Sequence, residues 1–308
     1  MLPNWLPLAA TALDLAFGDP PFLPHPVRAV GFALDRLEER APRGETARRL
    51  YGLACVVLLA GLCGALAYVL PKTPMLGEFI AVYLGFSGLA LGCLIREGEK
   101  AVRLINQGDL SAARTAVGLL VSRDTAHLSA NGLRRALAET LSENLCDGFA
   151  APLFYLALGG PGLLWAYKAV STADSMWGYK TDRFRALGWA AARSDDALAF
   201  IPARLCALTM LLAGLALKLN VRQAFANLRR DAAKSASPNA GWPMAAAAWL
   251  CDASMGGEDR YFGAPTQKPR LGPAGLPWDE TRLARLRLLV PVSGVLFAVL
   301  VQTALWLA

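Results

Sequence analysis

The stretch from Gly52 to Leu70 reads GLACVVLLAGLCGALAYVL and carries no charged side chain over 19 residues. A helix that crosses a bilayer needs about 20 consecutive, mostly apolar residues. A second uncharged run of 21 residues extends from Leu288 to Ala308. Together the two runs predict an integral membrane protein.

Three further apolar runs each contain one interruption: a glutamate, a Gly-Gly-Pro-Gly break or an arginine. They are Met75–Ile95 with Glu78, Gly148–Tyr167 with Gly159 to Gly162, and Ala197–Leu217 with Arg204. The sequence therefore predicts an all-α, polytopic integral membrane protein with about five membrane-embedded helical segments and helical or loop insertions at the cytoplasmic face. We expect residues 1–308 to form a single membrane-embedded domain.

The composition supports a membrane protein and argues against nucleic acid as a partner. Of the 308 residues, 55% are apolar and 18% are charged, against about 45–50% and about 25% in soluble proteins. The net charge of +7 suits basic loops that flank membrane spans and contact anionic lipid. No basic segment carries a groove-reading motif, so we expect membrane lipid and no nucleic acid among the partners.

Lysine and arginine residues indicate which loops face the cytoplasm. The loop before Gly52–Leu70 and the loop after Met75–Ile95 are both basic, whereas the turn between these two runs holds only Lys72. We therefore assign residues 96–147 and 218–286 to the cytoplasmic face. The basic loop 168–196 would lie outside if Gly148–Tyr167 crossed once. The Gly-Gly-Pro-Gly break favours a re-entrant hairpin there, although a single crossing that violates the rule stays open.

The segments between the runs carry few strand signals. Sustained alternation of apolar and polar residues is absent. Residues 235–279 are rich in proline and glycine, so we expect this segment to be a mostly irregular functional loop. The six cysteines form no C-x-x-C pair, which predicts reduced thiols packed among apolar side chains rather than metal ligands or disulfides.

The first cluster of polar residues beside an apolar run contains Asp19, His25 and Arg28. The prolines of DPPFLPHP, residues 19–26, fix the backbone in a non-helical conformation. The three side chains are candidates for substrate binding. The alternative is a rigid turn in which Asp19 caps the following helix and His25 is structural.

The second cluster places carboxylates at Glu139, Glu143 and Asp147, a spacing of i, i+4, i+8 that puts them on one helical face. Like charges at this spacing repel each other, whereas carboxylate oxygens and the Asn144 carbonyl suit Mg²⁺. We take these four residues, together with Asp174, as catalytic candidates. Of these, Glu143, Asp147 and Asp174 are the predicted metal ligands. The alternative is a solvated face paired with neighbouring arginines.

Further clusters at the edges of apolar runs offer basic or polar and aromatic side chains for substrate binding. They are Lys168, Lys180, Arg183 and Arg193; Arg204; and Asn239, Trp242 and Tyr261. Arg204 lies within an apolar run, where an ionisable residue is a functional candidate. The alternatives are lipid headgroup contact for the basic residues and an interfacial anchor for Trp242. The chain has no G-x-x-x-x-G-K-[ST] loop and no G-x-G-x-x-G fingerprint.

Taken together, the clusters resemble those of the CobD/CbiB family, the adenosylcobinamide-phosphate synthases, over nearly the whole chain and in the family's order. The matching motifs are Asp14 to Arg28, Arg123-Asp124-Thr125, Glu139 to Gly148, Ala151-Pro152-Leu153-Phe154, Tyr167-Lys168-Ala169, Asp174 to Lys180, Gly188-Trp189-Ala190, Asp195-Asp196, Ile201 to Leu205, Ser237 to Pro243 and Tyr261-Phe262-Gly263. Each motif is weak alone, and their joint presence makes the resemblance specific. The chain departs from the family pattern at Ser171, where asparagine is usual, at Met244, where glutamate is common, and at Cys146, where a small polar residue is usual.

The resemblance implies the reaction. The family joins a carboxylate of adenosylcobyric acid to the amine of (R)-1-amino-2-propanol, usually as its O-phosphate, to give adenosylcobinamide phosphate. A carboxylate is a poor electrophile, so we expect activation by ATP, with Mg²⁺ as cofactor. We expect the free pKa of the amine to resemble that of lysine, about 10.4. The amine must lose its proton before it attacks, which requires a general base or a site that lowers this pKa.

The resemblance also implies a multi-pass protein of the bacterial inner membrane whose active site faces the cytoplasm. The expected partners are the corrinoid, aminopropanol phosphate and membrane lipid, with other cobalamin-assembly enzymes and a homo-oligomer as further candidates. A membrane transporter and a non-catalytic membrane sensor or scaffold are the competing functions. A transporter predicts an internal repeat and charges near the middle of its spans, whereas this chain shows no repeat and gathers its charges at span edges.

Overall fold

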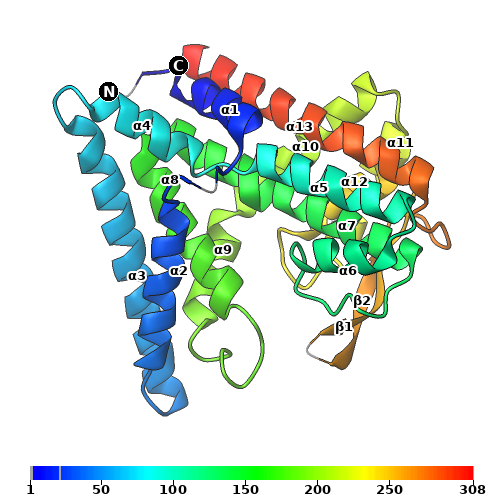
Figure 1. Ribbon diagram of the computed structural model, residues 1–308, viewed down its shortest axis with the longest axis horizontal. Helices are drawn as coiled ribbons and strands as arrows, with labels where there is room; N and C mark the ends of the chain where they lie inside the picture. The colour runs from blue at the N-terminus through cyan, green and yellow to red at the C-terminus, as the bar shows by residue number, and fades with distance from the viewer. Residues whose placement is uncertain (1–2, 21, 262, 308) are drawn as a thin grey trace. The chain divides into compact units, whose positions relative to one another are not determined.

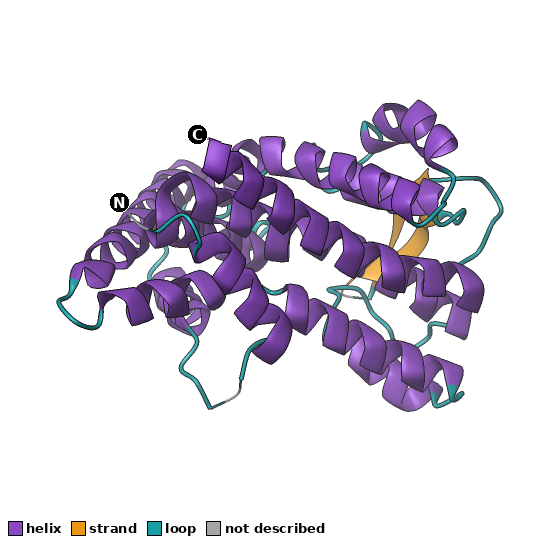
Figure 2. Ribbon diagram, turned by 90° about the horizontal axis from the view of Figure 1, so that it is seen from above, coloured by secondary structure: helices purple, strands orange, loops and turns teal. Residues whose placement is uncertain are grey.

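Helices make up almost all of the fold. The computed structural model describes residues 3–20, 22–261 and 263–307, with its elements labelled in Figure 1. Among these residues the strands form one small hairpin (Figure 2). Pro21, Phe262 and Ala308, which belong to segments discussed above, lie outside the described residues.

Four helical segments among the described residues are long and apolar enough to cross a membrane, and a bent pair of helices makes five if it counts as one span. They are Glu45–Lys72, Gly77–Asn106, Ala130–Trp177 and Glu280–Leu307, with Trp189–Leu198 and Phe200–Ala216 as the bent pair. Each of the predicted apolar runs overlaps one of these segments. The prediction of an all-α, polytopic membrane protein is confirmed.

The chain divides into two compact units, each built from segments that are far apart in the sequence. Unit 1 comprises Met1–Gly92, Ala151–Ala199 and Ala298–Ala308, and unit 2 comprises Cys93–Ala150 and Phe200–Phe297. The single membrane-embedded domain over residues 1–308 stays a prediction, as does the cytoplasmic placement of 96–147 and 218–286.

Unit 1 is built from helices that pack on α8. Its elements are α1 (Leu6–Phe17), α2 (Pro26–Glu39), α3 (Glu45–Val69), the 3₁₀ turn η1 (Leu70–Lys72), α4 (Gly77–Phe86), α8 (Ala151–Trp177) and α9 (Trp189–Leu198). The buried side chains of Leu34, Val56 and Trp177 join α2, α3 and α8 in one apolar core. Gly52 lets α3 approach the chain just before α9, because a Cβ at this position would lie 2.0 Å from the Leu187 carbonyl oxygen.

The Gly-Gly-Pro-Gly motif breaks α8, as the sequence predicts. Gly159 and Gly160 both leave helical geometry, and φ at Gly160 is 64°. Glycine adopts a positive φ without strain, whereas a residue with a Cβ does so rarely. Pro161 adds to the break because it offers no N–H to the helix. The re-entrant path of this segment stays a prediction.

Unit 2 contains the other helices and the hairpin. Its elements are α5 (Leu91–Asn106), α6 (Leu110–Gly118), α7 (Ala130–Asn144), the π-helix η2 (Leu145–Ala150), α10 (Phe200–Ala216), α11 (Val221–Ala232), α12 (Gly241–Leu250), β1 (Met255–Tyr261), β2 (Ala264–Leu271) and α13 (Glu280–Leu307). The first two residues of α5 and the part of α13 from Ala298 onward belong to unit 1. Helix α12 packs on α10 and α11, and β1 lies against α7 and α12.

Residues 235–279 are more ordered than the sequence predicts, and the expectation of a mostly irregular loop is wrong. The segment contains α12 and the antiparallel strands β1 and β2, whose register pairs Met255 with Leu271 and Asp259 with Thr266. Along β1, Met255, Gly257 and Asp259 are buried in alternation with more exposed residues. An apolar alternation is missing from the sequence because the buried face of this strand includes Asp259, which meets arginine side chains.

Asp231 joins α11 to α12 and to the end of β2. Its buried carboxylate accepts hydrogen bonds from Trp249 Nε1 at 2.8 Å, Gly272 N at 2.9 Å and Lys234 Nζ at 2.7 Å. Arg230 Nε donates a fourth at 3.2 Å. Burial alone would raise the pKa of Asp231, but the four donors outweigh burial, so this pKa lies below its usual value.

Asp231→Asn is therefore expected to lower the free energy of unfolding at pH 7 by about 1.5–3 kcal/mol. A carboxylate with a depressed folded-state pKa contributes stability above its unfolded pKa of about 3.9 and loses it as pH falls through the folded value. The difference in thermal midpoint between wild type and variant should stay constant from about pH 7 to pH 5 and close below about pH 4. A difference that widens on acidification would contradict a stabilising charge at Asp231.

Candidate functional site

A buried network of four charged side chains joins α7 to the hairpin in unit 2. Arg123, in the loop before α7, donates to Asp259 Oδ2 at 3.0 Å and to Glu139 Oε2. Arg135 donates to Asp259 Oδ1 and to the Gly256 carbonyl oxygen, each at 2.5 Å. Glu139 Oε1 accepts from Gly256 N at 2.8 Å. Each buried carboxylate is therefore matched by an arginine.

Arg123 lies at the centre of this network. Burial alone would lower the pKa of its guanidinium, but the carboxylates of Glu139 and Asp259 outweigh burial and raise it. The neighbouring Asp124 accepts from Gly263 N at 2.8 Å, and its own N–H donates to the Arg260 carbonyl at 2.9 Å. The two motif residues Arg123 and Asp124 thus hold the hairpin at its side and at its tip.

Glu139 and Glu143 are one turn apart on α7 and have different surroundings. The Glu139 carboxylate pairs with Arg123 and accepts a hydrogen bond from Gly256 N. Glu143 is partly exposed, and no ion pair among the described residues includes its carboxylate. The catalytic roles of both residues stay predictions, and the geometry favours Glu143 as the one available for chemistry.

Asn144 is oriented by the preceding turn of α7. Its Nδ2 donates to the carbonyl oxygen of Thr140 at 3.0 Å and to the hydroxyl of the same residue at 2.9 Å. The Thr140 hydroxyl in turn donates to the Leu120 carbonyl at 2.8 Å. With both contacts made through nitrogen, Asn144 keeps its amide oxygen as an acceptor for a ligand.

The predicted α-helical face from Glu139 to Asp147 is interrupted, because the π-helix η2 begins at Leu145. Such π-turns occur frequently at functional sites.

Asp174 belongs to unit 1, whereas Glu143 and Asp147 belong to unit 2. In the part of the chain that the structure describes, no group of three or more His, Cys, Asp or Glu side chains is placed to hold a metal ion. The metal-ligand roles of the three acids stay predictions.

Arg204 brings two of the sequence clusters together. Its guanidinium carbon lies 3.4 Å from the centroid of the Phe200 ring and 4.7 Å from that of Trp242. Its Nη1 donates to Asn239 Oδ1 at 3.3 Å and to the Phe200 carbonyl at 2.6 Å. Helix α10 therefore meets the chain around the start of α12 at a cation in contact with two aromatic rings. Tyr261, which the sequence analysis grouped with Asn239 and Trp242, lies at the end of β1.

Asp19 and His25 contact each other at the start of α2 in unit 1. His25 Nε2 lies 3.3 Å from Asp19 Oδ1, and His25 Nδ1 accepts from Val27 N at 3.2 Å. Since Nδ1 accepts, a neutral ring carries its proton on Nε2 and donates it to Asp19. His25 is therefore the helix cap, where the rigid-turn alternative predicted Asp19. Arg28 is exposed in the first turn of α2, and a substrate-binding role for the three stays a prediction.

Unit 1 contains four basic residues predicted to bind substrate, and the phosphate of the amine is the group that we expect them to contact. These residues are spread over three segments. They are Lys168 on α8, Lys180 and Arg183 in the loop 178–188, and Arg193 on α9. Arg183 Nε donates to Glu38 Oε1 at 2.5 Å, and this hydrogen bond together with the charge of Glu38 raises the pKa of Arg183. Lys180 and Arg193 are exposed. Convergence of the four on one phosphate group stays a prediction.

Sequence reasoning missed Asp259 and Asp231, two acids that hold the folded site together. Asp259 lies in the segment predicted to be irregular, and Asp231 follows two arginines near the end of α11. No local motif singles out either residue, because their partners are distant in the sequence. The sequence signal that could have found Asp259 is the motif Arg123-Asp124, because its charged side chains need partners on another segment.

A family model for CobD/Cbib proteins matches residues 7–290. The match includes both units and all five polar clusters. The chain belongs to the CobD/CbiB family. The resemblance drawn from the ordered motifs is confirmed.

Individual members of the CobD/CbiB family are similar to this chain along most of its length. It is 41% identical over 279 residues to the cobalamin biosynthesis protein CobD of Geobacter metallireducens, covering 89% of this chain and 88% of that protein. It is 38% identical over 293 residues to CobD of Listeria monocytogenes, covering 92% and 93%. It is 35% identical over 311 residues to the cobalamin biosynthesis protein CbiB of Salmonella arizonae, covering 97% of each. No solved structure is significantly similar to the chain.

Proposed function

We propose that this CobD/CbiB family member is an adenosylcobinamide-phosphate synthase, a carbon–nitrogen ligase of cobalamin biosynthesis. It joins a carboxylate of adenosylcobyric acid to the amine of (R)-1-amino-2-propanol O-phosphate or of aminopropanol itself. The observation that carries the proposal is the family match over residues 7–290, which spans all the candidate site residues. Relatives that match almost end to end are named for cobalamin biosynthesis.

The candidate groups in unit 2 suit activation of a carboxylate. ATP would supply a better leaving group on the corrinoid carboxylate, and Mg²⁺ would offset the charge on the phosphoryl oxygens. Glu143 and the amide oxygen of Asn144 are hard oxygen donors of the kind that Mg²⁺ takes. Asp147, in the same unit, is the further ligand that we propose. Holding the amine and the activated carboxylate together would supply much of the rate.

Substrate binding is proposed for the basic and aromatic groups. Arg204 and Trp242 present a planar cation beside an indole ring, which suits either a phosphate group or a flat portion of the corrinoid. Asn239 holds the guanidinium in place through its side-chain oxygen. Lys180 and Arg193 are exposed cations on another part of the chain, as binding of an anionic amine substrate requires.

We place the enzyme in the bacterial inner membrane with its site at the cytoplasmic face, because the segments 96–147 and 218–286 are basic. Single cysteines at the exposed positions Arg103 and Ala236, in a variant without the native cysteines, should react with an impermeant maleimide from the cytoplasmic side alone. Reaction from the periplasmic side alone would overturn this orientation.

The decisive experiment measures amide formation by the purified full-length protein. Adenosylcobyric acid, aminopropanol O-phosphate, ATP and Mg²⁺ should give adenosylcobinamide phosphate, detected by its mass, and omission of ATP or Mg²⁺ should stop the reaction. The same protein in vesicles should not accumulate corrinoid. Corrinoid uptake without amide formation would favour the transporter, and neither activity would favour a sensor or scaffold.

Lys180→Gln and Arg183→Lys are expected to raise the KM for the phosphorylated amine about tenfold each, since loss of one phosphate contact is worth roughly 1.4 kcal/mol. The KM for unphosphorylated aminopropanol should change little, because it lacks the phosphate. Arg185→Gln is the matched control, an exposed cation in the same loop. Equal KM values for wild type and both test variants would show that these cations only face lipid headgroups.

A further inference from the structure

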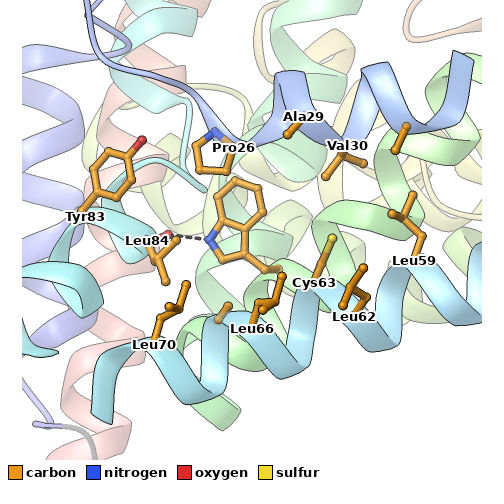
Figure 3. A pocket seen from close by; sticks show the side chains of 13 residues that line it. Pro26, Ala29, Val30, Leu59, Leu62, Cys63, Leu66, Leu70, Tyr83 and Leu84 are labelled. Atoms are coloured by element: carbon orange, nitrogen blue, oxygen red, sulfur yellow. Dashed lines mark hydrogen bonds between the residues drawn. The ribbon is translucent and has the colours of Figure 1, made fainter. Parts of the chain in front are cut away.

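An apolar groove lies between α2 and α3 in unit 1, and none of the candidate site residues lines it. Its cavity volume is about 440 Å³. Figure 3 shows Pro26, Ala29 and Val30 of α2 along one side and the side chains from Leu59 of α3 to Leu70 of η1 along the other. Every lining side chain is aliphatic or aromatic except the Cys63 thiol.

Apart from the Cys63 thiol, the side-chain polar atoms of the lining are already paired. Trp165 Nε1 donates to the Leu84 carbonyl at 2.9 Å, and the Tyr83 hydroxyl donates to the Pro24 carbonyl. A buried water needs two to four polar partners, which this groove does not offer. A polar ligand such as a corrinoid would leave its own groups unsatisfied there. The groove therefore selects a wholly apolar occupant.

The groove is continuous with the surface that α3 turns toward lipid. Leu62, Leu66 and Leu70 line the groove, and their exposed fractions are 58%, 51% and 44%. The helix belongs to a candidate span whose most apolar window is only 22% buried inside the protein. An occupant can therefore enter sideways from the hydrocarbon core of the bilayer.

The length of the groove matches one leaflet. Leu59 and Leu70 are eleven residues apart, which is about 16 Å along a helix, and half of the bilayer hydrocarbon core is about 15 Å. Leu59 lies near the middle of the uncharged run Gly52–Leu70, and Leu70 lies at its end. Lys72 follows two residues later, with its Nζ 3.5 Å from the centroid of the Tyr68 ring. A cation thus stands where a lipid headgroup would lie.

We infer that this groove binds one acyl chain of an anionic phospholipid, with Lys72 contacting the headgroup phosphate. The apolar lining takes the chain, and the cation at the end of α3 favours a negatively charged headgroup. The site is independent of the proposed synthase activity, because none of its lining residues belongs to the candidate catalytic or substrate-binding set.

The test uses the full-length protein in detergent with phosphatidylglycerol that carries a photoactivatable diazirine in its acyl chain. Cross-linked peptides are identified by mass spectrometry. Adducts should concentrate on residues 26–33 of α2 and 59–70 of α3. Ala33→Phe and Ala29→Phe place a ring in the groove and should lower adduct yield about tenfold, the effect of losing about two buried methylenes. Ala29 is exposed, so this second variant does not disturb the core.

Ala65→Phe is the matched control, an exposed alanine of α3 outside the groove lining, and its adduct yield should equal that of wild type. Lys72→Gln should reduce the yield with phosphatidylglycerol to the level obtained with phosphatidylcholine. Equal yields for the groove variants and Ala65→Phe, or adducts spread evenly over exposed α3, would overturn the site. Cross-links between α3 segments of two copies would assign the groove to a second copy instead.

Discussion

Glu143→Gln is expected to lower the rate of amide formation by about 10²- to 10⁴-fold, the range for loss of a group that acts directly on the reacting atoms. The variant keeps the size of the side chain and one acceptor oxygen but removes the charge that would hold Mg²⁺. No ion pair among the described residues depends on Glu143, so the fold should persist. Steady-state rates at saturating and limiting Mg²⁺ measure the effect. Asp147→Asn should behave similarly.

Glu139→Gln is the comparison variant, one turn earlier on the same helix. Glu139 is buried and paired with Arg123, so the expected effect is first on stability. The thermal midpoint should fall in Glu139→Gln and stay near wild type in Glu143→Gln. Near-normal rates of amide formation by Glu143→Gln and Asp147→Asn at limiting Mg²⁺ would show that this carboxylate cluster is only a solvated helix face.

The membrane fold could be predicted from the sequence because hydrophobic length is a local property. The uncharged run Gly52–Leu70 is contained in one candidate span. The break in α8 at Gly159 and Gly160 could also be predicted from the sequence, because glycine next to proline disrupts a helix. These signals need no knowledge of the partners that each segment meets.

The hairpin and the charge network could not be predicted, because they depend on contacts between residues that are far apart in the sequence. Strand β1 reads MGGEDRY, and its buried positions are filled by a methionine, a glycine and an aspartate. Only the presence of Arg123 and Arg135 makes Asp259 an inward-facing residue. The sequence showed that Arg123 belongs to a motif and that Glu139 is one of several carboxylates. It did not show that the two are partners.

The structure brings some of the predicted site residues together and separates the surroundings of others. The Arg204 cluster assembles with Asn239 and Trp242, although 35 residues separate Arg204 from Asn239. The two glutamates of α7 have different partners, because Glu139 pairs with Arg123 while Glu143 has no ion-pair partner among the described residues. Helical spacing predicts which side chains share a face, but tertiary contacts decide which of them stay available to a ligand.

Arg123→Met is expected to lower the free energy of unfolding by about 3–5 kcal/mol, because it leaves the Glu139 and Asp259 carboxylates buried with too little positive charge. Both acids have almost no exposed side-chain area, so water cannot compensate for the lost arginine. Unfolding of the detergent-solubilised protein, followed by tryptophan fluorescence, measures the change. Arg134→Met is the matched control. Arg134 lies next to Arg135 and hydrogen-bonds only asparagine side chains among the described residues, so its loss should cost less than about 1 kcal/mol.

A double-mutant cycle separates loss of the ion pair from loss of packing. If Arg123 and Glu139 stabilise each other, the double variant Arg123→Met/Glu139→Gln should be less destabilised than the sum of the two single variants, by about 0.5–3 kcal/mol. The reason is that Glu139→Gln removes the buried carboxylate charge that Arg123→Met leaves without a partner. Arg135 still pairs with Asp259 in the double variant, so the hairpin keeps one attachment to α7. Strictly additive effects would show that Arg123 acts through its packing rather than through its charge.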